Sequence, residues 1–346
     1  MKISIVSDVP WGYGSPQISY LRDSLLAEGI EIQYLVPSYP DRPLLKLDGI
    51  TEILSEGNPF TWEGMIAFGK RAASKIGDFA PDKLIIANPR SLVVLPFLRT
   101  SGKNIIYYGL EPIVDHGTNF LQSISLQRFN FSLGIFPNIE RAQADSHLLA
   151  LPSTHVRIVR NVPKLLRNPE LDTQKKIVTY AGALDSKWVN FQVLKEAAST
   201  VPLEIWGHTS KRIHPSIANS YRGNLPHSEI GRVYERTAIS LIIWNPINFG
   251  TRNAAPNKFF EAMSFGVPSV SFPYPQVVEF VGKFGIGFVS EDFSKESFLR
   301  TLNSAYSSIQ TNQFREMQER CLELHKNQLN WESESKSLIQ EIVSIG

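Results

Sequence analysis

The segment from Asn253 to Pro268 holds the residues whose types and spacing are best suited to chemistry. Pro256 is typical of the first turn of a helix, where its missing N–H leaves no hydrogen bond unmade. The three backbone amides before it would then point outward near the helix N-terminus, which is a ready site for an anion. Lys258 lies in the same first turn, and Glu261 follows three residues later on the same face. This arrangement suits a nucleoside diphosphate, with the lysine on a phosphate and the carboxylate on two ribose hydroxyls.

The same Lys258–Glu261 spacing also occurs in surface ion pairs on ordinary capped helices, which are common and weak. The motif by itself therefore leaves that alternative open. Gly266 is expected to end the helix, since glycine is typical of the position after the last turn.

A second group of ionisable residues follows the apolar run at 103–108. Glu111, Asp115 and His116 lie close together in one loop. Each could act as a general base that takes a proton from a hydroxyl group, so these are the candidate catalytic residues. A solvated loop that carries charges is the alternative.

Glycines mark further positions where a ligand could come close to the backbone. Gly12 and Gly14 follow the first apolar run, and Gly182 follows the run at 176–180. Gly207 precedes His208 at the end of another predicted strand, which would bring that histidine toward the ligand. A plain strand-to-helix turn and a surface histidine are the respective alternatives.

The elements that must position these residues alternate between short apolar strands and amphipathic helices. In the first 160 residues the predicted strands are 3–6, 31–36, 83–87, 103–108, 133–136 and 156–159. The predicted helices are one that carries Ile18, Leu21, Leu25 and Leu26 at helical spacing, then 62–78, 91–100 and 118–131. This alternation predicts a doubly wound α/β domain with a parallel sheet.

A second alternation follows a predicted linker at 162–176. Its predicted strands are 176–180, 202–206, 238–244 and 267–272, and its predicted helices are 190–200, 230–236, 256–264, 298–306, 313–328 and 331–345. We therefore expect an α/β fold with two Rossmann-like doubly wound domains facing a central cleft. Ligands of open parallel sheets bind beyond the carboxyl ends of the strands, which places a small-molecule site there.

The overall composition excludes several other classes of protein. Lys plus Arg number 35 against 33 Asp plus Glu, a balance that gives no support to a nucleic-acid partner. The single cysteine, Cys321, excludes an intrachain disulfide and fits a reducing cytoplasm. No cysteine or histidine cluster and no Asp-x-Asp pair suggests a metal, so neither a metal nor a cofactor is expected. No apolar stretch is long enough to span a membrane, although contact with the inner membrane face stays open.

The spacing in the first segment resembles the donor-site motif of GT-B glycosyltransferases, particularly the large retaining family 4. It reads P-x-K-x-x-E-A-M-x-x-G-x-P from Pro256 to Pro268. Three further stretches resemble the family in the same order along the chain. They are the N-terminal glycine turn and helix at 12–29, the strand and turn at 177–184 and the base-cradling loop at 223–234.

This resemblance implies a GT-B architecture with domains at 1–163 and 175–329, and a C-terminal helix at 330–346 that packs back on the first domain. It implies a UDP- or GDP-sugar donor and a saccharide or lipid-linked acceptor. In that family the carboxylate that matches Glu261 binds the ribose. A basic residue after the first glycine turn binds the diphosphate, for which Lys187 is the nearest candidate and Lys211 a weaker one. The implied donor-binding residues are Gly12, Gly14, Gly182, Lys187, His208, Leu225, Asn253, Ala254, Lys258 and Glu261.

The sequence departs from the family at Asn253, where many members carry a glutamate that contacts the donor sugar. An amide can still bond a sugar hydroxyl, but the change leaves the sugar and the stereochemistry open. If the reaction inverts, the base would be Asp115, His116 or Glu111. Two rivals stay open as well. One is a sugar-nucleotide epimerase of similar fold, and the other is a non-catalytic glycosyltransferase-like partner subunit.

Overall fold

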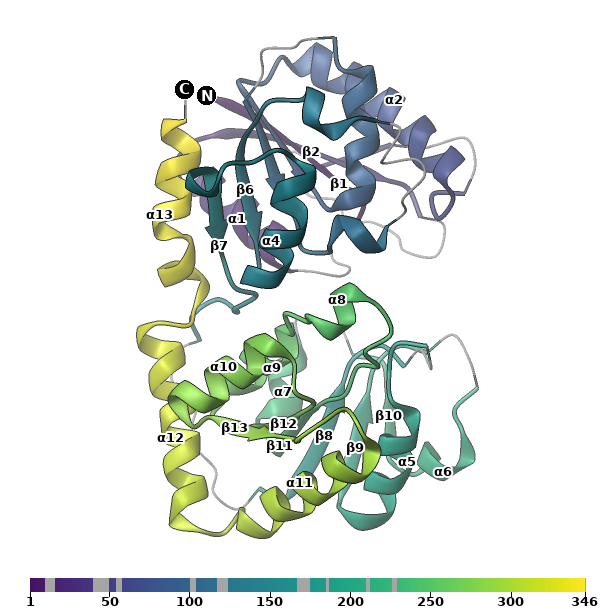
Figure 1. Ribbon diagram of the computed structural model, residues 1–346, viewed down its shortest axis with the longest axis vertical. Coiled ribbons are helices and arrows are strands. Elements are labelled where there is room, and N and C mark those ends of the chain that lie inside the picture. Colours follow the sequence, from purple (N-terminus) through teal and green to yellow (C-terminus); the bar gives the residue numbers. More distant parts are fainter. Residues whose placement is uncertain are drawn as a thin grey trace. The chain divides into compact units, whose positions relative to one another are not determined.

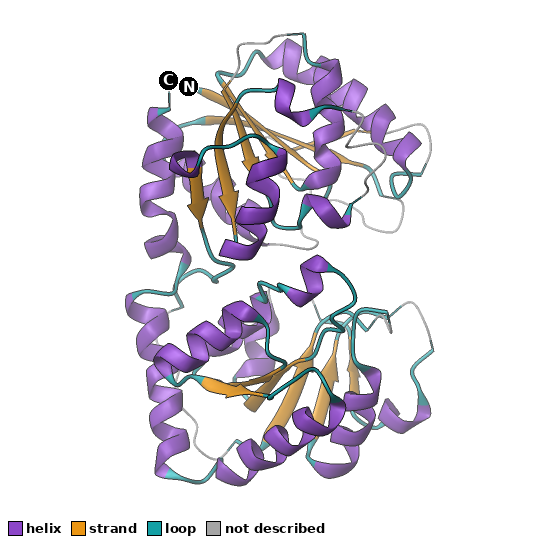
Figure 2. Ribbon diagram, in the orientation of Figure 1, coloured by secondary structure: helices purple, strands orange, loops and turns teal. Residues whose placement is uncertain are grey.

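The computed structural model describes residues 1–9, 16–39, 50–53, 58–99, 104–116, 124–166, 175–184, 187–209, 212–225 and 229–345 (Figure 1). The chain divides into two compact units. Unit 1 comprises Met1–Arg160 and Glu334–Gly346, and unit 2 comprises Asn161–Ser333. In each unit, helices flank a parallel sheet (Figure 2). The predicted fold class, two Rossmann-like α/β domains with a long C-terminal helix, is confirmed.

Within the described residues, the sheet of unit 1 has seven strands in the order β3-β2-β1-β4-β5-β6-β7, and each neighbouring pair is parallel. The order runs outward from β1 on one side and from β4 on the other. The topological switch point, where ligands of such sheets bind, therefore lies between β1 and β4. The strands are β1 (Lys2–Ser7), β2 (Glu31–Pro37), β3 (Ile50–Ile53), β4 (Lys83–Ala87), β5 (Asn104–Tyr108), β6 (Phe131–Phe136) and β7 (Val156–Ile158).

The helices of unit 1 begin and end where local chemistry favours it. At the start of α2 (Trp62–Phe79), the Thr61 side chain accepts a hydrogen bond from the Gly64 amide, and Ala80 ends the helix in a left-handed conformation. Phe68 and other apolar residues of α2 at helical spacing face the core. The others are α1 (Pro16–Ala27), η1 (Pro89–Phe97), η2 (Ile113–Asp115), η3 (Leu126–Arg128), α4 (Ile139–Leu148), η4 (Ser153–His155) and α13 (Trp331–Ser344), which belongs to unit 1 from Glu334 onward.

Helix α13 packs back on unit 1, as the resemblance implies. The buried Lys83 amine donates hydrogen bonds to the carbonyl oxygens of Ile342 (2.6 Å) and Val343 (2.7 Å). Arg157 binds Glu341 through two hydrogen bonds of 2.7 Å. Lys83 thus occupies the C-terminal end of the helix, where unpaired carbonyls and the helix dipole favour a cation.

The described sheet of unit 2 has six parallel strands in the order β10-β9-β8-β11-β12-β13. By the same reasoning its switch point lies between β8 and β11. The strands are β8 (Ile177–Ala181), β9 (Leu203–Trp206), β10 (Tyr221–Gly223), β11 (Thr237–Ile242), β12 (Ser269–Ser271) and β13 (Gly287–Val289).

One core joins the sheet of unit 2 to its helices. Phe260 is fully buried in it, and its ring centroid lies 5.2 Å from that of Phe259 and 5.4 Å from that of Phe280. Burying a side chain of this size contributes about 1.5–3 kcal/mol. The helices are α5 (Phe191–Thr200), α6 (Pro215–Ala218), α7 (Ile230–Tyr234), α8 (Phe249–Arg252), α9 (Asn257–Ser264), α10 (Pro275–Phe284), α11 (Lys295–Ser308) and α12 (Asn312–Asn327). Among the helices that the structure places, none is long and apolar enough to cross a membrane.

Two predicted helices of unit 1 are wrong in type. The segment predicted as a helix at 91–100 is the 3-10 helix η1, whose interior contains Pro96. Proline cannot donate the backbone hydrogen bond of a regular helix. The helix predicted at 118–131 begins in residues outside the described ones. Its described part holds the short turn η3 and then Phe131, the first residue of β6. Phe131 is buried against the Tyr107 ring, so packing on the sheet decides its conformation.

Candidate functional site

Three neighbouring strands of unit 2 each meet a glycine at their carboxyl ends. Gly182 follows β8, Gly207 follows β9, and Gly223 ends β10. The Gly182 amide donates to the Trp206 carbonyl (2.8 Å), and the Gly207 amide donates to that of Gly223 (2.8 Å). A Cβ atom on Gly207 would lie 1.8 Å from the Gly182 carbonyl oxygen. The backbones of the two turns therefore touch, and no larger residue than glycine fits at Gly207.

The Lys258 side chain lies directly against Gly182. A Cβ atom on Gly182 would lie 2.2 Å from Lys258 Cε and 2.6 Å from Nζ. The ammonium group also lies 4.8 Å from the centroid of the Trp244 ring, a cation–π distance. Gly182 follows β8 and Trp244 lies shortly after β11, so these contacts are at the switch point of unit 2. The structure thus brings Gly182 and Lys258, two of the sequence-predicted residues, together there.

The environment of Lys258 favours an anionic ligand. Burial lowers the pKa of the Lys258 amine, and the nearby Glu261 carboxylate opposes that effect. An anion placed beside the amine would offset the loss of hydration of the charged form. An attraction of this kind is stronger in a partly buried position than in bulk water.

Helix α9 presents Lys258 and Glu261 because its other face is committed to the core. Phe259, Phe260 and Met263 are buried, whereas Lys258 and Glu261 are partly exposed. The sequence predicted Pro256 in the first turn of the helix, whereas in the structure it is the N-cap residue, one position before that turn. Burial is the main cause that raises the pKa of the Tyr234 hydroxyl, and the charge of Glu261 is the second. Glu261 therefore lies near Tyr234 as well as near Lys258.

Asn253 helps to end helix α8. Its backbone amide and its Nδ2 atom both donate to the Phe249 carbonyl, at 2.9 and 3.0 Å. Helix α8 starts with a reciprocal pair of bonds between Asn248 and Thr251. The Asn253 side-chain amide is therefore turned toward the helix backbone. The next residue, Ala254, is buried.

Three more of the predicted donor-binding residues are described, and they lie along the same carboxyl edge of the sheet of unit 2. His208 is exposed after Gly207, and its carbonyl accepts the Leu184 amide (2.8 Å). Leu225 follows β10 and is partly exposed. Lys187 is exposed, with its ammonium 4.8 Å from the Trp188 ring centroid. Gly12, Gly14 and Lys211 lie outside the described residues.

In unit 1, the three candidate catalytic residues lie in one loop after β5, with Glu111 just before the short helix η2 and Asp115 and His116 at its end. The His116 amide donates to the Ile113 carbonyl (3.0 Å), which closes the short helix η2 around Asp115. Burial lowers the pKa of His116, while the charges of Glu111 and Asp115 raise it. The imidazole is therefore neutral at pH 7 and able to accept a proton.

Sequence reasoning missed two polar residues at the switch point of unit 1. Asp8 directly follows β1 and Asn88 directly follows β4, and Asn88 Nδ2 donates to Asp8 Oδ1 (3.1 Å). A polar residue at the end of each of two predicted strands was visible in the sequence. Asp145 of α4 was missed as well. It is buried and accepts the Ile113 amide at 3.0 Å.

Solved structures resemble the whole chain in fold. A sucrose-phosphate synthase from Thermosynechococcus elongatus matches at a TM-score of 0.76 with 14% identity, covering 100% of this chain and 99% of its own. HepE from Anabaena, in complex with UDP and glucose, matches at 0.73 with 14% identity over 100% of both chains. WaaG, a glycosyltransferase involved in lipopolysaccharide biosynthesis, matches at 0.71 with 12% identity, over 99% of this chain and 100% of its own. The chain has the GT-B glycosyltransferase fold.

No protein-family model and no curated protein matches this GT-B chain in sequence. At identities of 12–14%, these structural likenesses show the fold alone. The chemistry must be argued from the residues of the chain itself.

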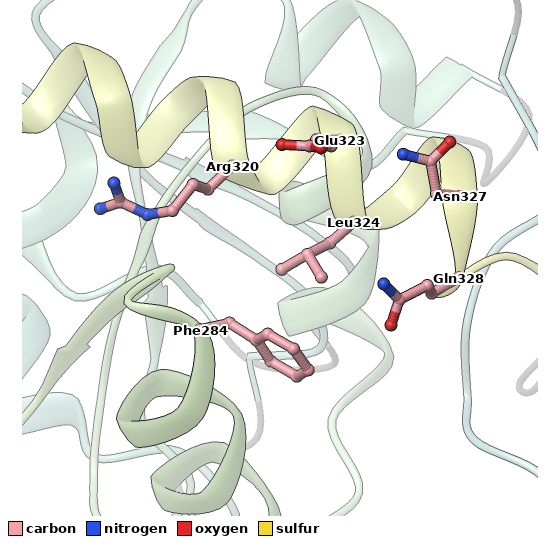
Figure 3. A pocket seen from close by; sticks show the side chains of 6 residues that line it. All are labelled: Phe284, Arg320, Glu323, Leu324, Asn327 and Gln328. Carbon is pink, nitrogen blue, oxygen red and sulfur yellow. The ribbon is translucent and has the colours of Figure 1, made fainter.

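A pocket of about 250 Å³ lies in unit 2, between the end of α10 and α12 (Figure 3). None of the sequence-predicted site residues lines it, and the Arg320 guanidinium there donates to the Gly285 carbonyl (3.1 Å). Its lining residues are Phe284, Arg320, Glu323, Leu324, Asn327 and Gln328. Within the part of the chain that the structure describes, no three His, Cys, Asp or Glu side chains are grouped so as to hold a metal ion.

Proposed function

We propose that the chain is a glycosyltransferase that uses a UDP- or GDP-sugar donor and a saccharide or lipid-linked acceptor. The observation that carries the proposal is the Lys258 ammonium group, which lies against Gly182 and over the Trp244 ring at the switch point of unit 2. A cation beside a close backbone turn at this place suits a diphosphate. The HepE structure with UDP-glucose, which has the same fold, supports this choice of ligand.

Each residue of the donor site has one proposed role. Lys258 neutralises the diphosphate, and the turn at Gly182 lets the backbone approach the phosphates. Glu261 accepts hydrogen bonds from the ribose hydroxyls. Lys187 supplies a second positive charge from the loop after Gly182, and His208 contacts the donor from the turn after β9.

The remaining residues of the donor edge have more peripheral roles. Leu225 packs against the base, while Asn253 and Ala254 border the donor sugar.

We place this donor-binding domain at 175–329 and the acceptor-side domain at 1–163 with 330–346. Among the acceptor-side residues, Glu111, Asp115 and His116 are the candidate bases for the acceptor hydroxyl.

A thermal-shift screen with UDP, GDP, ADP, CDP and dTDP tests the donor site. A nucleotide at about 100 times its Kd stabilises the folded protein by about 2.7 kcal/mol. One of the five is expected to raise the Tm of the wild type but not that of Lys258→Ala or Glu261→Ala. The responding nucleotide identifies the base that the site accepts.

Lys283→Ala is the matched control for the lysine. The Lys283 amine also lies over an aromatic ring, 4.9 Å from the Phe284 centroid, but at the end of α10 rather than at the donor site. This variant should keep the full shift. A wild type that responds to none of the five nucleotides, or a Lys258→Ala variant that responds as the wild type does, would contradict the proposal.

We further propose that turnover needs no divalent metal, because Lys258, Lys187 and the N-terminus of α9 neutralise the leaving diphosphate. Activity should therefore persist in EDTA. A loss of activity that Mg²⁺ or Mn²⁺ restores would show that a metal carries out this step.

A second candidate is a non-catalytic partner subunit with the same fold. It is favoured by Asn253, whose side-chain amide is bound to the Phe249 carbonyl instead of lying free beside the donor edge. Turnover by the isolated chain excludes this candidate. Product analysis without an acceptor then separates a transferase from an epimerase, since an epimerase would convert the donor into a new nucleotide sugar.

A further inference from the structure

The two units place opposite chemistry at equivalent points of their sheets. In unit 2 the switch point holds the close turn at Gly182 and the cationic side chain of Lys258. In unit 1 it holds the carboxylate of Asp8, directly after β1, and the amide of Asn88, directly after β4. A negative charge repels a diphosphate, whereas it accepts hydrogen bonds well from hydroxyl groups. The switch point of unit 1 therefore suits a neutral ligand that is rich in hydroxyls.

Asn88 has an unusual backbone conformation. Its φ of 69° and ψ of 158° fall in a region that side-chain-bearing residues rarely adopt. The backbone amide of Asn88 donates to the Tyr108 carbonyl (2.9 Å), and the side-chain Oδ1 accepts hydrogen bonds from the backbone amides of Leu110 (3.2 Å) and Glu111 (3.3 Å). Strain of this kind persists where the surroundings over-determine it, as they do at many functional sites.

Asn88 therefore joins three strand ends through one buried side chain. Its Oδ1 holds the start of the loop that carries the candidate bases. Its Nδ2 donates to Asp8 Oδ1 at 3.1 Å and so fixes the direction of that carboxylate. The Tyr39 hydroxyl donates to the Asp8 carbonyl (2.8 Å) and holds the backbone of the same residue.

Asp8 is half-buried as a residue, and no described basic side chain lies within ion-pair distance of its carboxylate. The charged and titratable groups that face it are Arg90 of η1, Glu111 of the loop, Tyr34 of β2 and Tyr107 of β5. Burial raises the pKa of Asp8 to about 6, and the Asn88 hydrogen bond and Arg90 oppose this rise. The group is therefore ionised at neutral pH, and none of the described residues forms a salt bridge with it.

We propose that Asp8, oriented by Asn88, is the acceptor-binding carboxylate of unit 1, and that it accepts a hydrogen bond from a hydroxyl of the saccharide acceptor. This inference rests on the proposed function, because it assigns to unit 1 the second substrate of a sugar transfer. Asn88 acts through Asp8 and the loop, so it is a positioning residue.

The test measures saccharide binding directly. Ligand-observed NMR titrations with the methyl glycosides of glucose, galactose, mannose and N-acetylglucosamine are compared for the wild type, Asp8→Asn and Asp82→Asn. Asp82 is the matched control. It lies in the same unit at the amino end of β4, and its Oδ2 atom accepts the Lys2 amide (2.8 Å). At least one glycoside should bind the wild type and Asp82→Asn equally, and Asp8→Asn at least about tenfold more weakly.

The pH dependence distinguishes a binding role from a structural one. Glycoside affinity of the wild type should fall as the pH drops through about 6, where Asp8 becomes protonated, and that of Asp8→Asn should not. Equal affinity of the wild type and Asp8→Asn would overturn the proposal, as would a wild type that binds none of the four glycosides. The nucleotide titration is a separate readout. A wild type that binds no nucleotide contradicts the proposed function, whereas normal nucleotide binding by Asp8→Asn with unchanged glycoside binding contradicts the role of Asp8 alone.

Discussion

Replacing Asp8 by asparagine is expected to stabilise unit 1 at neutral pH, even though it should weaken saccharide binding. Burial raises the pKa of the Asp8 carboxyl from 3.8 to about 6, so the charged form is disfavoured in the folded protein relative to the unfolded chain. Asparagine has nearly the same shape and keeps an oxygen that can accept the Asn88 hydrogen bond. It removes only the charge.

The sign and size of the effect follow from linkage. Because the folded pKa lies above the unfolded one, the protonated carboxyl contributes its full stability below pH 3.8, and this contribution is lost as the pH rises through about 6. The difference between the two pKa values corresponds to about 3 kcal/mol of unfolding free energy. This is an upper bound, because Asp8 is partly exposed and solvent screens its charge. For a domain of this size it amounts to a rise in Tm of up to about 10 °C.

Differential scanning calorimetry of the wild type and Asp8→Asn tests the reasoning. The two proteins should have nearly equal Tm at about pH 4, and the variant should be the more stable at about pH 8. A difference that does not change with pH would refute it. So would a wild type that is the more stable protein at about pH 8, since the carboxylate would then be stabilised by the fold rather than disfavoured by it.

Three further perturbations have defined outcomes. Gly182→Ala should displace the Lys258 side chain and weaken nucleotide binding by about tenfold in a calorimetric titration. The control Gly77→Ala, whose Cβ would meet nothing within 4 Å, should leave binding unchanged. Equal effects of the two substitutions would count against the contact between Gly182 and Lys258. Lys83→Met removes two hydrogen bonds to the end of α13 and should lower the unfolding free energy in urea by about 2 kcal/mol; an unchanged urea midpoint would disprove this anchoring role. Burial lowers the pKa of His325, so its neutral ring contributes stability above pH 6.5 that is lost as the pH falls through the lower folded pKa. Thermal midpoints of wild type and His325→Gln should therefore converge on acidification, and parallel curves would exclude this.

The donor segment was predictable because its signals are local. Pro256 lies at the start of α9, and Gly266, with a φ of 67°, follows its end. These residues set the helix ends through their own backbone chemistry. The contact between Lys258 and Gly182 could not be predicted in the same way, because it depends on which strands are neighbours at the switch point.

The errors have equally specific causes. Strands β10 and β13 have three residues each, one of which is a glycine, so neither shows the run of apolar residues that marks a strand in the sequence, and neither was predicted. The edge strand β3 was also missed. The carboxylate at Asp8 gains its meaning from Asn88, and that pairing requires β1 and β4 to be adjacent. Sequence order separates these two strands by β2 and β3.

Helix α13 also affects the order in which the protein can be assembled during synthesis. Unit 2 is one continuous stretch, Asn161–Ser333, but unit 1 needs Glu334–Gly346, which leave the ribosome after all of unit 2. Until then the amine of Lys83 lacks the carbonyls of Ile342 and Val343 that it binds in the folded unit. Of the two units, the one whose synthesis starts first is therefore the last to be completed. A nascent chain that stops before α13 would leave the surface of unit 1 that α13 covers accessible to chaperones and proteases.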